Sequence, residues 1–253
     1  MINGIILEIC AGSIRDIETI IAFKEIDRIE LNNSMELGGL TPSPGTLLTA
    51  RKLTSLPIIC MVRPRPAGFV YNPREKETML ADARWLLENG ANGIAFGCLT
   101  EENTVDEPFA KAMVDICHGY GKEAVFHMAF DQARDCDEAT VSLIQCHVDR
   151  ILLKGCAESA QQGIPAISRL QKTYGDQIAF LPGGGVTSAN IRHIVTKTWC
   201  SQIHMSAKAT LHDAADYYAV SSANIRRAIM ALSDARQRVF TREDASMLME
   251  ANK

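Results

Sequence analysis

The chain has 253 residues, of which 47% are hydrophobic and 22% charged, so it can bury a sizeable core and lacks the composition of a disordered protein. Its net charge is −4 and no run of lysine and arginine occurs, which argues against nucleic acid or an anionic membrane surface as a partner. The N-terminus shows no basic segment or cleavage site, and no apolar run approaches the roughly 18 residues that a membrane helix needs, so we expect a cytoplasmic protein.

Short apolar segments rich in β-branched residues alternate with longer amphipathic segments along the chain. The strands are predicted at residues 5–10, 28–31, 57–62, 93–96, 123–126, 150–153, 178–181 and 202–205. Helices between them begin at polar residues typical of N-caps, namely Ser13, Ser43, Asn72 and Asp106. Proline follows Ser43 and Asn72 at the first helical position, and Gly90 marks the end of the third helix.

Neighbouring strands recur every 25 to 35 residues or so, which is about the length of a βαβ unit. Eight such repeats favour a closed (β/α)8 TIM barrel, an α/β fold, over an open sheet. A Rossmann-type sheet is the alternative, but no G-x-G-x-x-G motif follows the first strand. We therefore predict one domain, with the barrel at residues 1–212 and a helical extension at 213–253, containing helices near 224–232 and 241–249, that packs on the barrel or joins a dimer interface.

Polar and sulfur-containing residues gather where the predicted strands end, and barrels of this kind place their active sites at that rim. These residues are Glu8, Cys10, Glu30, Asn32, Arg63, Arg65, Cys98, His127, Asp131, Lys154, His204, Ser206 and Lys208. Glu8 and Cys10 are two residues apart, as are Glu30 and Asn32, so each pair points to one side of its strand. The alternative is a rim whose polar groups only satisfy one another and cap helices.

The rim carboxylates, arginines and histidines suit general acid–base work on a small anionic or sugar-phosphate-like substrate, as in an isomerase or lyase. The candidate catalytic residues are Glu8, Glu30, Arg63, His127, Asp131 and Lys154. His127 is predicted to shuttle a proton, Asp131 or Glu30 to orient it or act as base, and Arg63 to hold a carboxylate or phosphate. Lys154 suits either a Schiff base or an ordinary ion pair.

Three consecutive glycines, Gly183, Gly184 and Gly185, follow the seventh predicted strand and precede a helix expected to open near residues 187–188. Loops after strands seven and eight of such barrels often bind phosphate through backbone N–H groups. Arg65, His204 and Ser206 complete this candidate ligand-binding set. A tight turn that needs positive φ explains the glycines equally well.

The eight cysteines are scattered without a C-x-x-C pair, so they do not form a zinc finger or a thioredoxin motif, and we expect reduced thiols. Cys10 and Cys98 lie at strand ends and, with His127 or His204, suit a soft metal ion. Each of these cysteines taken alone is typical of a buried thiol.

Several motifs together resemble the CutC copper homeostasis family. They are L-E-I-C at 7–10, D-R-I-E-L at 27–31, G-G-L-T-P-S at 38–43, M-V-R-P-R at 61–65, F-H-M-A-F-D at 126–131 and the glycines at 183–185. The resemblance runs in order from about residue 5 to residue 206. It implies a cytoplasmic TIM barrel, a homodimer or higher homo-oligomer, and a part in copper homeostasis with copper(I) as ligand at Cys10; no catalytic activity is firmly attached to it.

The chain departs from the family pattern at three positions. Asn32 stands where the family has a second cysteine, Met128 stands where it has arginine, and Lys154 lies in a strand-six end that usually reads T-S-G. An amide is a poor copper(I) ligand compared with thiolate or thioether, so the two-cysteine site is broken unless Met35 or Cys98 substitutes. Lys154 is predicted to restore part of the positive charge that Met128 removes.

Overall fold

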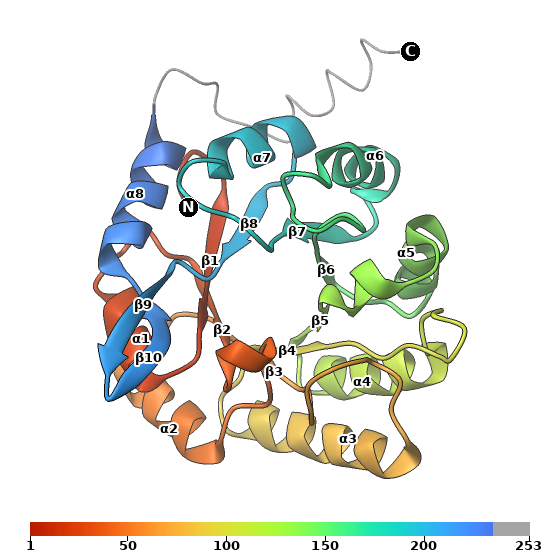
Figure 1. Ribbon diagram of the computed structural model, residues 1–253. Helices are drawn as coiled ribbons and strands as arrows, with labels where there is room; N and C mark the ends of the chain where they lie inside the picture. The colour runs from red at the N-terminus through yellow and green to blue at the C-terminus, as the bar shows by residue number, and fades with distance from the viewer. Residues whose placement is uncertain (235–253) are drawn as a thin grey trace.

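The eight parallel strands of the barrel pair in the order β7-β6-β5-β4-β3-β2-β1-β8 in the computed structural model, which describes residues 1–234 (Figure 1). The two end strands, β7 and β8, contact each other and leave the barrel nearly closed. The strands are β1 (Ile6–Ala11), β2 (Arg28–Leu31), β3 (Ile58–Met61), β4 (Gly93–Phe96), β5 (Glu123–Phe126), β6 (Arg150–Leu153), β7 (Ala179–Pro182) and β8 (Gln202–Met205). The predicted (β/α)8 barrel is confirmed.

Helices surround the barrel, and the first four begin at the predicted caps Ser13, Ser43, Asn72 and Asp106. The helices are α1 (Ile14–Ile21), α2 (Pro44–Leu53), α3 (Pro73–Glu88), α4 (Glu107–Gly119), α5 (Cys136–Gln145), α6 (Ile164–Tyr174), α7 (Ile191–Thr198) and α8 (Ser222–Ser233). The Asn72 side chain accepts hydrogen bonds from the backbone N–H groups at the start of α3, and the Glu75 carboxylate accepts the backbone N–H of Asn72, which completes a capping box. None of these helices within residues 1–234 is long and apolar enough to cross a membrane.

The barrel interior holds both an apolar cluster and hydrogen-bonded polar side chains. Ile59, Ala95, Val125 and Leu152, from β3 to β6, form a small apolar cluster separate from the main core between strands and helices. Among the polar side chains, Gln202 of β8 accepts hydrogen bonds from Arg28 of β2 at 2.7 Å and from Arg150 of β6 at 3.3 Å. These contacts join strands that are not neighbours, so they cross the barrel interior.

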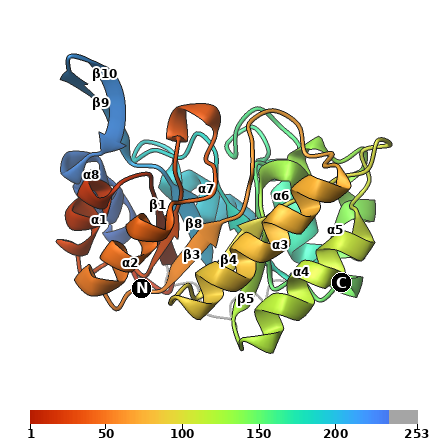
Figure 2. The same ribbon diagram turned by 90° about the horizontal axis from the view of Figure 1, so that it is seen from below.

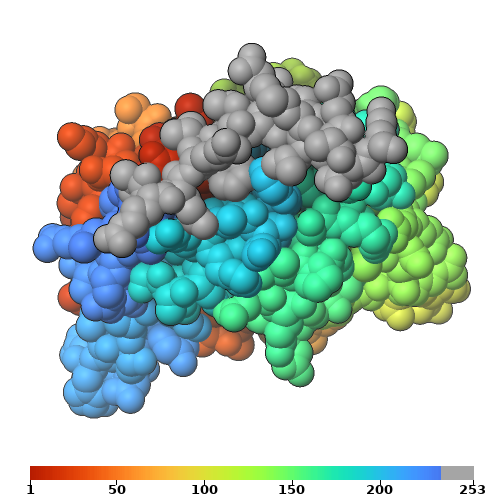
Figure 3. Space-filling view, turned by 90° about the horizontal axis from the view of Figure 1, so that it is seen from above, coloured from red at the N-terminus to blue at the C-terminus, as the bar shows by residue number. Residues whose placement is uncertain are grey.

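The segment after the last barrel strand is a hairpin, whereas the sequence predicted helix from about Asp213. β9 (Lys208–Asp213) and β10 (Ala215–Val220) pair antiparallel, and they project from the barrel in Figures 2 and 3. The helix prediction was wrong here because pairing with β9 (Tyr217 opposite Leu211) suits the strand preference of tyrosine. The predicted helix at 224–232 is confirmed by α8, while the one at 241–249 lies outside the described residues.

Candidate functional site

A cavity of about 610 Å³ lies at the carboxyl ends of the barrel strands. The polar and sulfur-containing side chains that line it include Cys10, Glu30, Asn32, Met35, Met61, Arg63, His127, Met128, His204, Ser206 and Lys208. Most of the predicted rim residues therefore meet in one place, which is the end of the barrel where active sites lie.

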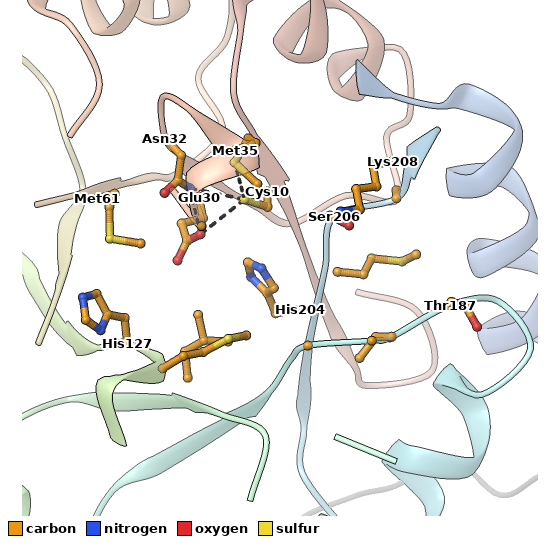
Figure 4. A pocket seen from close by; sticks show the side chains of 18 of the residues that line it. Cys10, Glu30, Asn32, Met35, Met61, His127, Thr187, His204, Ser206 and Lys208 are labelled. Carbon is orange, nitrogen blue, oxygen red and sulfur yellow. Dashed lines mark hydrogen bonds between the residues drawn. The ribbon is translucent and has the colours of Figure 1, made fainter. Parts of the chain in front are cut away.

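The thiol of Cys10 is the centre of a compact group of donor atoms (Figure 4). Its Sγ lies 3.4 Å from Oε2 of Glu30 and 3.6 Å from Sδ of Met35. Asn32 donates through Nδ2 to Cys10 Sγ at 3.2 Å and to Glu30 Oε2 at 2.8 Å. Single ligand atoms of Cys10, Glu30 and His204 lie within 4.8 Å of one another, and all three residues are buried. The Cys10 cluster consists of Cys10, Glu30, Asn32, Met35 and His204.

Strand register produces this cluster. Cys10 lies opposite Glu30 in the β1–β2 pairing, and Glu8 lies opposite Arg28 in β2 and His204 in β8. Alternate residues of a strand share one face, so these side chains stack inside the barrel in two layers. The Cys10 cluster forms the layer nearer the rim.

The deeper layer holds His204 in place. His204 Nδ1 lies 2.7 Å from Oε1 of Glu8, and the other Glu8 oxygen accepts a hydrogen bond from Arg28. Burial alone would raise the pKa of Glu8, but the charges of Arg28 and His204 outweigh it and hold this pKa well below its usual value. Because Nδ1 faces the Glu8 carboxylate, Nε2 is the imidazole nitrogen left to serve the Cys10 cluster.

Protons in the Cys10 cluster are held tightly. Burial raises the pKa of Cys10 well above its usual value, and the charge of Glu30 and its hydrogen bond to the thiol add to the effect. Burial also raises the pKa of Glu30, with a further contribution from the charge of Glu8. For His204, burial lowers the pKa, but Glu30 and Glu8 together raise it above its usual value. The Cys10 thiol therefore keeps its proton unless a metal ion displaces it.

His127 lies on the cavity wall as a neutral imidazole. Burial and the nearby charge of Arg63 lower the pKa of His127 to about 3. Its Nδ1 accepts the backbone N–H of Ala129 at 3.1 Å, so the ring proton is on Nε2, and this buried nitrogen has no hydrogen-bond partner within the described residues. His127 is therefore a hydrogen-bond donor at neutral pH, whereas the sequence suggested a proton shuttle.

Arg63 lines the cavity but is largely engaged with the protein. Its guanidinium donates to the backbone carbonyls of Leu37, Gly38, Gly39 and Ala67 at 2.8–3.2 Å. It also lies 5.0 Å from the ring centroid of Phe69, within cation–π range. These contacts fix the two loops that follow β2 and β3.

Three other predicted site residues do not line the cavity. The Asp131 carboxylate accepts backbone N–H groups of Lys154 at 2.9 Å and Cys156 at 2.8 Å instead of orienting His127. The Lys154 side chain packs beside Gly184 at the edge of the cavity but does not line it, and its replacement of the charge lost at Met128 stays a prediction. Arg65, in the loop before α3, forms an ion pair with Glu75 in the first turn of that helix.

The glycine turn borders the cavity at one side. Gly184 and Gly185 line it and have φ values of +86° and +73°, which glycine adopts without strain, whereas Gly183 does not line it. The following helix, α7, begins at Ile191, three residues later than the sequence suggested. Ser206 lines the same cavity.

Sequence reasoning missed two residues of the deeper layer, Arg28 and Gln202. Arg28 precedes Glu30 by two residues and Gln202 precedes His204 by two, so both share the inward face of their strands. That two-residue spacing was the available signal. Their partners on other strands were visible only in the structure.

An eight-stranded α/β barrel with a thiol, thioether, carboxylate and imidazole cluster at its rim defines a TIM-barrel protein with a candidate soft-metal site. The sequence profile of the CutC family matches residues 5–209. The chain belongs to the CutC family.

Individual relatives agree with this assignment. A CutC family protein of Treponema denticola is 41% identical over 81% of this chain and 82% of its own length. The human protein named copper homeostasis protein cutC homolog is 35% identical over 82% of this chain and 75% of its own. The crystal structure of the Streptococcus agalactiae protein described as CutC superposes with a TM-score of 0.74 at 30% identity, covering 80% of this chain and 98% of that one.

Proposed function

We propose that this CutC protein takes part in copper homeostasis by binding copper(I) at Cys10, Met35 and His204. The observation that carries the proposal is the close approach of one thiol and one thioether, 3.6 Å apart, beside a buried imidazole. Thiolate, thioether and imidazole are the donors that copper(I) prefers. The residues present therefore fit the metal even though Asn32 replaces a family cysteine.

The neighbouring groups would support binding without being soft ligands themselves. Glu30 accepts the hydrogen bond of the Cys10 thiol, so its carboxylate lies where the displaced proton would first go. Glu8 would keep Nε2 of His204 directed at the metal. Asn32 donates to the Cys10 sulfur and would partly offset thiolate charge.

The test is anaerobic titration of the fully reduced protein with copper(I) against a competing chelator. Loss of a group that only hydrogen-bonds to a metal ligand weakens metal binding by roughly 10- to 100-fold. Cys10→Ser removes a ligand itself, so it should weaken copper(I) binding by more than that. Cys98→Ser is the matched control, because Cys98 is also buried just beyond a strand end but lies outside the Cys10 cluster. Equal affinity in wild type and in a folded Cys10→Ser variant would refute the proposal.

The second candidate function is binding or turnover of a small anionic or sugar-phosphate-like molecule. Two observations favour it: the cavity of about 610 Å³ falls within the roughly 300–1,000 Å³ of small-molecule sites, and His127 offers an unpaired N–H donor. A thermal-shift panel of phosphorylated sugars tests it, with His127→Phe as the variant that should lose any response. If no compound raises the melting temperature of the wild type, this candidate fails.

A further inference from the structure

A pair of cysteines meets on the surface, in a part of the barrel separate from the Cys10 cluster. The sulfur atoms of Cys136 and Cys156 are 2.7 Å apart. Cys156 is exposed and Cys136 is partly exposed, whereas the other six cysteines are buried. These two thiols are therefore the ones that a solute reaches most readily.

The backbone around both cysteines is held in place by other contacts. The Asp131 carboxylate accepts the N–H groups of Lys154 and Cys156, which fixes the turn after β6. In that turn Gly155 and Cys156 both have left-handed φ values, +77° and +55°. Such a conformation costs about 1 kcal/mol or more at a residue with a side chain, so the surrounding contacts must maintain it.

Cys136 occupies the opposite side of the pair as the first residue of α5, directly after the N-cap Asp135. The Cys156 thiol donates to the sulfur of Cys136. This hydrogen bond lowers the pKa of Cys136 to about 7 against the opposing effect of burial, and the same interaction raises the pKa of Cys156. Near neutral pH, Cys136 therefore supplies a thiolate and Cys156 a neighbouring thiol.

We propose that Cys136 and Cys156 form a redox-active dithiol that a hydroperoxide oxidises to an intramolecular disulfide. The Cys136 thiolate attacks one peroxide oxygen, the O–O bond breaks, and the sulfur becomes a sulfenic acid while hydroxide leaves and takes up a proton. The Cys156 sulfur then attacks the sulfenic sulfur, the S–O bond breaks, and water leaves with the Cys156 proton. With hydrogen peroxide, two thiols lose two electrons and two protons, and two waters form.

The experiment treats reduced, copper-free protein with hydrogen peroxide in the presence of a copper chelator. After quenching and unfolding, the remaining free thiols are labelled with a maleimide and counted by mass spectrometry. Two of the eight thiols should disappear first, peptides containing Cys136 and Cys156 should be linked, and a dithiol reductant should restore both.

Three variants separate the roles of the two cysteines. Cys156→Ser should stop at a sulfenic acid on Cys136 that dimedone traps. Cys136→Ser should slow oxidation about tenfold near pH 7, because a thiol of ordinary pKa near 8.5 is only a few per cent thiolate there. Cys146→Ser, a change at a buried cysteine, should oxidise like the wild type.

The proposal is overturned if peroxide links other cysteines, joins two chains instead of one, or oxidises Cys136→Ser as fast as the wild type. None of these results depends on copper binding. The peroxide experiment therefore tests the dithiol independently of the copper(I) site.

Discussion

Replacing Asn32 by cysteine should tighten copper(I) binding, because it places a second thiol against that of Cys10. Asn32 Nδ2 is 3.2 Å from Cys10 Sγ, and the residue is 1% exposed, so a shorter cysteine side chain remains inside the cluster. Exchanging an amide for a thiolate beside copper(I) should raise affinity at least about tenfold, or roughly 1.4 kcal/mol.

The same substitution has a predictable cost in the metal-free protein. It removes the hydrogen bonds that Asn32 donates to Cys10 and to Glu30 at 2.8 Å. At about 1 kcal/mol for each net hydrogen bond, the free energy of unfolding should fall by about 2 kcal/mol. Domains of this kind are commonly stable by roughly 5–15 kcal/mol, so the variant should fold, and copper(I) at 100 times its Kd should add about 2.7 kcal/mol.

The assay is anaerobic competition for copper(I) together with urea unfolding of the metal-free and loaded forms. Asn33→Cys is the matched control, because Asn33 is the next residue but is exposed and points away from the Cys10 cluster. The control adds an equal number of thiols and should leave the affinity of the tight site unchanged. If both variants bind copper(I) as the wild type does, or both gain equally, residue 32 does not face the metal.

Three further predictions concern the same region. Arg28→Leu removes one of the two cationic partners of the buried Glu8 carboxylate and leaves only His204, so it should lower the free energy of unfolding by about 3 kcal/mol, the lower end of the cost of breaking a buried ion pair, measured in urea at neutral pH; a loss below about 1 kcal/mol would contradict the inferred network. The imidazole of His127, whose pKa is lowered to about 3, should remain an uncharged Nε2–H tautomer by NMR at about pH 5. Because that folded-state pKa lies below the unfolded value, stability should be lost as pH falls from about 6.5 towards 3; titration of the His127 ring near 6.5 would exclude this. Copper(I) affinity should rise by at least about tenfold per pH unit between about pH 6 and 8, because the raised pKa of Cys10 makes binding release one proton, and the raised pKa of His204 adds a second wherever its imidazole is protonated. Cys10→Ser should lower this slope by about one proton.

The spacing of residues on single strands predicted much of the candidate site. Glu30 and Asn32 were expected on one face of β2, and Cys10 at the end of β1, and all three line the cavity. The roles were harder to predict. Asp131 suggested an acid–base partner for His127, but its carboxylate holds the turn at Lys154 and Cys156, because two converging N–H groups lie there in the folded chain.

The sequence by itself determined the barrel, since strand and helix patterns, caps and glycine stops are local signals within one βα unit. It also placed Cys10, Glu30 and His204 at the same rim, because every parallel strand ends there. Only the tertiary structure decided which groups touch across strands: the Glu8–Arg28–Gln202 layer, the Cys10–Met35 contact and the Cys136–Cys156 pair. These contacts join residues about 20 or more positions apart, and their distances depend on strand register and loop conformation, which no short stretch of sequence specifies.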